Sequence, residues 1–68
     1  MVDKKMIMSR AVLNGYTQRS LAEAVGINKN TLNRKLNGRA DFTLIEVNSI
    51  CKLLNIDDIG EKAKIFLR

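Results

Sequence analysis

The sequence has no histidine, no proline and no tryptophan, and it has a single cysteine, Cys51. One thiol cannot form a disulfide within the chain, and without histidine it does not provide the ligand spacing of a zinc site. The same absences exclude the nucleophile–base pairs on which nucleophilic catalysis depends. No phosphate-binding loop or dinucleotide-binding glycine pattern occurs. We therefore expect no enzyme activity, no metal and no cofactor.

Long apolar runs are also absent. The apolar stretches have four residues or fewer, which is far too short for a membrane span. None of them follows Met1–Lys5 in the way that a signal peptide requires. A lone cysteine suits a reducing compartment. We expect a soluble cytoplasmic protein that does not contact membranes.

The amino-terminal part of the chain is strongly basic. Residues 1–40 carry eight Lys or Arg residues and two acids, a net charge of +6, whereas residues 41–68 carry four bases and five acids, a net charge of −1. Between Glu23 and Asp41 there are four bases and no acid. A one-sided basic stretch is typical of a protein that binds the phosphate backbone of a nucleic acid, although a merely solvated face can have the same composition.

Apolar residues recur at intervals of three and four, which indicates helices throughout. We predict an all-α, compact five-helix bundle that forms a single domain over residues 1–68. The expected helices cover residues 3–14, 18–25, 29–37, 44–54 and 58–67. Glycines suited to C-terminal caps follow the first three helices: Gly15, Gly26 and Gly38. Candidate N-caps precede the last four: Thr17, Asn28, Thr43 and Asp57.

The same periodicity predicts which residues form the core. The expected inward-facing residues are Ile7, Ala11, Leu21, Ala22, Val25, Leu32, Leu36, Val47, Ile50, Cys51, Leu54, Ile59, Ala63 and Phe66. Tyr16 is expected to pack beneath the second and third helices. Apolar residues that this core does not need include Ile45, Leu53, Ile65 and Leu67.

The segment from Thr17 to Asn37 has the spacing of a helix-turn-helix. Two helices that are joined by a three-residue turn must cross steeply. Ala22 must be small because the next helix packs over it, and Gly26 must take a left-handed backbone conformation. Leu32 must be buried to seat the second helix against the first. All three requirements are met at spacings of four and six residues.

This segment resembles the Cro/CI-type helix-turn-helix family of phage and bacterial regulators. The resemblance rests on Gln18, Leu21, Ala22, Gly26, Ile27, Leu32, Asn37 and Gly38, and it extends through Phe42–Leu44 into the fourth helix. Residues 30–38 are particularly similar to small prophage regulators of Gram-positive bacteria. The resemblance implies a lambda-repressor-like fold and a Cro-like repressor that binds a two-fold-related operator as a dimer.

In such a motif the second helix enters the major groove, and its first residues contact base edges. The residues expected to contact bases are Lys29, Asn30, Thr31 and Arg34. Lysine and arginine can donate to guanine, asparagine can pair with adenine, and the threonine methyl can meet a thymine methyl. Gln18 matches the family residue that meets a phosphate. The further expected phosphate contacts are Thr17, Arg19, Asn33, Asn37, Arg39 and Arg10.

The sequence departs from the common family pattern at three positions. Many members carry a glutamate at Leu36 that pairs with an arginine at Ala11. An apolar pair in place of a buried ion pair is physically coherent, because such a replacement is often neutral or stabilising. The third departure is Lys35, which stands where an aliphatic residue is usual.

An alternative is a protein-interaction module of the same fold, such as an antirepressor that binds an opposing repressor, or an antitoxin. The apolar residues left outside the predicted core would serve such a partner or self-association. The exposed basic and amide side chains of the third predicted helix favour DNA binding over this alternative. One core of this size rarely supplies more than about 3–5 kcal/mol of net stability, which leaves good helix packing, dimerisation, or both. Dimerisation is expected through the fifth predicted helix and the loop before it, around Asn55–Phe66.

Overall fold

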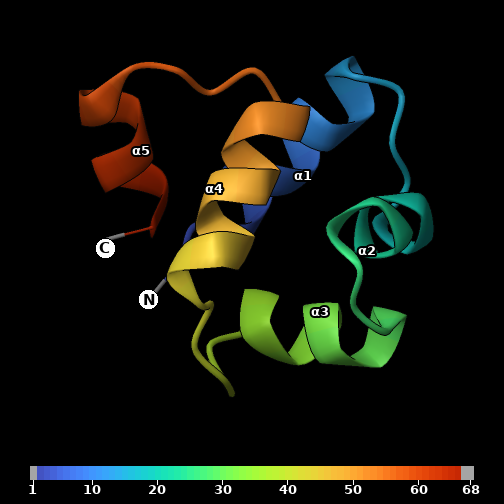
Figure 1. The fold of residues 1–68 in the computed structure, drawn as a ribbon. Coiled ribbons are helices and arrows are strands. Elements are labelled where there is room, and N and C mark those ends of the chain that lie inside the picture. Colours follow the sequence, from blue (N-terminus) through green and yellow to red (C-terminus); the bar gives the residue numbers. More distant parts are fainter. Residues whose placement is uncertain (1, 67–68) are drawn as a thin grey trace.

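In the computed structural model, which describes residues 2–66, the chain forms five helices and no strand (Figure 1). The helices are α1 (Lys4–Leu13), α2 (Gln18–Val25), α3 (Lys29–Leu36), α4 (Leu44–Leu53) and α5 (Ile59–Phe66). The predicted all-α five-helix fold is confirmed, and within the described residues each predicted helix end lies within one residue of the observed one. The predicted fifth helix extends to Leu67, which lies outside the described residues.

Side-chain caps set most of the helix ends. Thr17, Asn28 and Thr43 accept hydrogen bonds from backbone N–H groups at the start of α2, α3 and α4, as predicted. The prediction that Asp57 caps the last helix is wrong. This helix begins at Ile59, so Asp58 is the residue in position, and its Oδ2 accepts from the Glu61 N–H at 3.0 Å.

The core contains nine of the residues that the sequence predicted, together with two that it did not. The fully or almost fully buried apolar residues are Ile7, Ala11, Leu21, Ala22, Leu32, Leu36, Ile50, Cys51, Leu54, Ile56 and Ile65. Ala11 and Leu36 lie in one cluster, so apolar packing replaces the ion pair of the common family pattern. Tyr16, Val25, Val47, Leu53 and Phe66 are partly buried and pack against the same cluster.

The orientation of α5 differs from the prediction. Ile59 was expected to face inward but is 82% exposed, whereas Ile65, placed outside the core by the sequence pattern, is fully buried. The reason is that the carboxyl end of α5 lies beside the amino end of the chain (Figure 1). The Asp3 N–H donates to the Ile65 carbonyl at 2.7 Å, and the rings of Phe42 and Phe66 meet edge to face at 5.9 Å.

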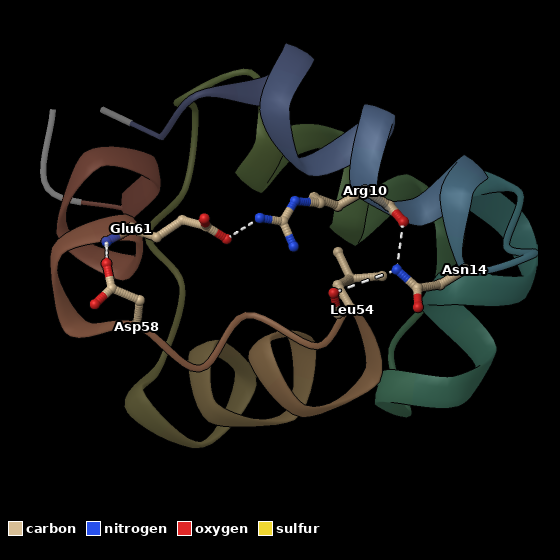
Figure 2. A network of polar contacts seen from close by, with 5 residues as sticks. All are labelled: Arg10, Asn14, Leu54, Asp58 and Glu61. Atoms are coloured by element: carbon tan, nitrogen blue, oxygen red, sulfur yellow. Dashed lines mark hydrogen bonds and ion pairs between the residues drawn. The ribbon is translucent and has the colours of Figure 1, made fainter.

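A second polar contact joins the carboxyl ends of α1 and α4. The Asn14 amide donates to the carbonyls of Arg10 (2.8 Å) and Leu54 (3.2 Å) (Figure 2). Asn55, in a left-handed conformation with φ of 56°, donates to the Asn14 side chain at 2.7 Å. No helix in residues 2–66 is long and apolar enough to cross a membrane.

Candidate nucleic-acid interface

The geometry of α2 and α3 follows from caps within a few residues of each helix end. Thr17 Oγ1 accepts from the Ser20 N–H at 3.1 Å, and Ser20 Oγ accepts from the Thr17 N–H at 2.9 Å, so a complete capping box starts α2. Gly26 ends α2 in the left-handed region with φ of 90°, and its N–H donates to the Ala22 carbonyl at 2.9 Å. This conformation is costly for residues with a Cβ.

Because the turn is short, α3 begins only a few residues after the end of α2, and it crosses α2 steeply (Figure 1). Asn28 Oδ1 accepts from the Asn30 N–H at 2.7 Å, which confirms Asn28 as the cap of α3. Leu32 is fully buried and Ala22 almost so, and the two belong to one core cluster. Ala22, Gly26 and Leu32 therefore have the burial and backbone conformation that the motif requires.

The residues expected to contact bases lie on the outer side of α3. Lys29, Asn30 and Arg34 are exposed and Thr31 is partly buried. Within residues 2–66 no carboxylate forms an ion pair with Lys29 or Arg34, and the Asn30 side chain makes no hydrogen bond there. These donors and acceptors are consequently available to an external partner.

Three of the residues expected to contact phosphates are connected by hydrogen bonds. The Gln18 Nε2 donates to Asn33 Oδ1 at 3.3 Å, and the Asn37 Nδ2 donates to the same oxygen at 3.2 Å. Lys4, which the sequence did not suggest, joins them because its Nζ donates to Asn37 Oδ1 at 3.2 Å. The signal for Lys4 is a contact between residues 33 positions apart, which local periodicity cannot show.

The other expected phosphate contacts have different surroundings. Arg19 and Arg39 are exposed. Thr17 is exposed, but its hydroxyl is occupied by the capping box. Arg10 stands apart from the set, because its guanidinium extends toward α5 and pairs with Glu61 (Figure 2). The structure therefore gathers the α2 and α3 residues on neighbouring elements and holds Arg10 in a contact of its own.

Lys35 is partly buried and packs against α4 rather than being presented to a ligand. Its Nζ lies 2.5 Å from Glu46 Oε1, and both side chains are little exposed, at 12% and 13%. The same Glu46 oxygen accepts from the Thr43 N–H at 2.9 Å. The hydrogen bond from Lys35, with that from Thr43, holds the pKa of Glu46 below its usual value. This pair links α3 to α4 and accounts for a lysine where the family usually has an aliphatic residue.

The remaining reactive group is sequestered. Cys51 is 3% exposed, and burial raises the pKa of its thiol. Among the described residues no group of three or more His, Cys, Asp or Glu side chains is placed to hold a metal ion.

The two short helices cross steeply, and the second presents basic and amide side chains that have no partner among the described residues. This arrangement defines a helix-turn-helix DNA-binding domain. The chain belongs to the Cro/C1-type HTH DNA-binding domain family, whose model matches residues 4–61. This family typically lacks catalytic activity. Comparison with curated proteins and with solved structures finds no significant match.

Proposed function

We propose that the protein is a sequence-specific transcriptional regulator of the Cro-like repressor type, which reads double-stranded DNA with α3 in the major groove. The observation that carries this proposal is the outer side of α3, where Lys29, Asn30 and Arg34 are exposed and have no ionic partner among the described residues. In a helix-turn-helix these positions face base edges. A good bidentate contact to a base discriminates by about 1–3 kcal/mol.

The test is a binding titration with the duplex that lies beside the protein's own gene and a scrambled duplex of the same length, at several salt concentrations. Asn30→Ala and Arg34→Ala are measured alongside the wild-type protein. We expect preference for the native duplex, a steep salt dependence, and loss of preference in both variants. Equal weak binding to both duplexes that the substitutions do not change would contradict the proposal.

The proposal includes a homodimer that binds a two-fold-related operator in the cytoplasm. A groove of about 640 Å³ runs between α4, α5 and the loop after α3, and its lining includes Phe42, Val47, Ile59 and Phe66. Ile59 is 82% exposed at the edge of this groove. It lies within Asn55–Phe66, the segment expected to dimerise. Burying such a residue against a second copy would remove apolar surface from water.

Sedimentation of the wild-type protein and of Ile59→Asp at micromolar concentration tests this part. A wild-type dimer that Ile59→Asp converts to a monomer is the expected result. A wild-type monomer that binds a palindrome without cooperativity would remove the dimer from the proposal. An opposing repressor from a prophage circuit is the alternative occupant of this groove, as the resemblance implies.

A further inference from the structure

The hydrogen bonds on one side of α3 form a continuous chain across three helices. It runs from Gln18 at the start of α2, through Asn33 on α3 and Asn37 just after α3, to Lys4 at the start of α1. Each link is between 3.2 and 3.3 Å. We call these four residues the polar strip.

The side-chain oxygens of both asparagines in the strip already accept hydrogen bonds from other members of the strip. Asn33 Oδ1 accepts from both Gln18 and Asn37, and Asn37 Oδ1 accepts from Lys4. The Asn37 amide nitrogen donates to the Asn33 side chain at 3.2 Å and to the Asn33 carbonyl at 2.9 Å. An amide nitrogen has two N–H groups, so the donors of Asn37 are already used.

The donors that remain are those of the other three residues. An ammonium has three N–H groups and an amide has two. Lys4 Nζ and Gln18 Nε2 each make one hydrogen bond in the strip, and Asn33 Nδ2 makes none within residues 2–66. The strip therefore has unused N–H donors and a cation at one end, while both asparagine oxygens already accept hydrogen bonds. This combination favours binding of an anion.

We propose that Lys4 is a phosphate-binding residue of the DNA interface and that Asn37 positions its ammonium without itself donating to the DNA. This inference rests on the proposed function, because the anion that the strip would meet is the phosphate backbone of the duplex. Lys4 adds a charge at the α1 end of the strip. A phosphate contact is independent of base sequence and contributes to binding of every duplex.

Lys5 is a matched control for Lys4. It is the next residue of the same helix, it carries the same charge, and it is exposed. It lines a surface hollow with Met8 and Val12 that does not include Lys4, whereas the ammonium that donates to Asn37 is that of Lys4. Replacing either lysine by alanine changes the net charge equally, so a difference between the two variants reports the position of Lys4 and not the total charge.

The experiment measures binding of the wild-type protein, Lys4→Ala, Lys5→Ala and Lys4→Arg to the native and the scrambled duplex between about 50 and 200 mM salt. A phosphate contact contributes about 0.9 to the slope of log affinity against log salt, which corresponds to about eightfold in affinity at 0.1 M salt. We expect Lys4→Ala to lose about this factor on both duplexes and to flatten the slope by about 0.9. Lys5→Ala and Lys4→Arg should stay close to the wild type.

Asn37→Ala tests the positioning role. We expect a smaller loss than for Lys4→Ala on both duplexes, and no additional loss when Asn37→Ala is combined with Lys4→Ala. An additional loss of full size in the double variant would show that Asn37 contacts the DNA independently and would overturn its assigned role.

Thermal unfolding of each variant separates a binding effect from a loss of fold. If the wild-type protein binds and Lys4→Ala and Lys5→Ala change its affinity by the same factor, the role of Lys4 is overturned and the proposed function stays intact. A folded wild-type protein that binds neither duplex would overturn both.

Discussion

The helix-turn-helix and α5 differ in where their stabilising contacts come from. In the helix-turn-helix, Thr17 is paired with Ser20, Asn28 with the Asn30 N–H, and Gly26 with the Ala22 carbonyl. Apart from the local Asp58 cap, the contacts of α5 come from distant segments: Asp3 meets Ile65, Arg10 meets Glu61, and Phe42 meets Phe66. The ends of α2 and α3 are therefore specified by their own sequence, whereas α5 depends on the rest of the chain being in place.

The two regions also treat their arginines differently. Arg34 and Arg39 are exposed, and no described carboxylate forms an ion pair with either of them. Arg10 is partly buried and paired with Glu61. The positive charges of Arg34 and Arg39 are thus left open to a polyanion, while the arginine between α1 and α5 is already neutralised within the protein. A binding surface and a structural contact are built here from the same residue type.

The largest expected effect is that of Leu32→Ala. Leu32 is fully buried, and truncation of a buried leucine costs about 2–5 kcal/mol. A domain of this size has only about 3–5 kcal/mol to lose. Urea unfolding followed by circular dichroism should show a largely unfolded variant, whereas Leu44→Ala, at a residue that is 76% exposed, should change little. A stable Leu32→Ala protein would mean that local caps alone seat α3.

The sequence predicted what depends on neighbouring residues. The first residues of α2, α3 and α4 follow from the N-caps Thr17, Asn28 and Thr43, whose hydrogen bonds are to residues two or three positions away. Periodicity could not show that Ile65 is buried and Ile59 exposed, because the packing of α5 is decided by the amino end of the chain.

The residues of the candidate site also fall into those that a local sequence pattern predicts and those that depend on distant contacts. The outward residues of α3 could be predicted from the motif alone. The contact of Lys4 with Asn37, and the pairing that draws Arg10 toward α5, arise between residues far apart in the sequence. No local pattern contains that information.

Glu46 provides a smaller effect that links the two regions. It completes the capping box of α4 and pairs with Lys35 of α3. We expect Glu46→Ala to lower the free energy of unfolding by about 1–2 kcal/mol through loss of the cap and the ion pair. Glu46→Gln keeps an acceptor for the cap and removes the charge, so it should lose less. Equal losses in urea unfolding would assign the whole effect to the ion pair.

The contribution of Glu46 should also depend on pH. Its pKa is lower in the folded protein than in the unfolded chain, where a glutamate titrates near about 4.3. The stabilisation is therefore fully present above the unfolded pKa and is lost as the pH falls through the folded pKa. The difference in unfolding free energy between wild type and Glu46→Gln should shrink as the pH is lowered from about 6 to 3. A constant difference would contradict this assignment.

The contrast between the arginines is tested by Arg10→Ala and Arg39→Ala. Because Arg10 is engaged by Glu61, we expect its loss to cost less than about 1 kcal/mol of stability and to leave the salt dependence of DNA binding unchanged. Arg39→Ala should flatten the salt slope by about 0.9. An equal flattening by Arg10→Ala would place Arg10 at the DNA, as the sequence suggested, and would remove the contrast.

The smallest expected effect concerns Gly60, in the first turn of α5. A glycine within a helix is less favourable than alanine by about 0.5–1 kcal/mol, so Gly60→Ala should strengthen a helix that begins with a single cap. A Cβ at this position would lie 3.1 Å from Asp58 Oδ2, the oxygen that caps α5. Asp58 is exposed and can move by a few tenths of an ångström, which weakens the cap and offsets part of the gain.

We therefore expect Gly60→Ala to stabilise the protein by a few tenths of a kcal/mol, less than the full difference of about 0.5–1 kcal/mol between glycine and alanine. In an Asp58→Ala background there is no carboxylate to displace, and the same substitution should give the full gain. Thermal unfolding of the four proteins measures this difference. If Gly60→Ala gave the same gain in both backgrounds, the cap would not limit α5. The start of α5 would then be as well determined as that of α2, and the contrast between the two regions would rest on the distant contacts alone.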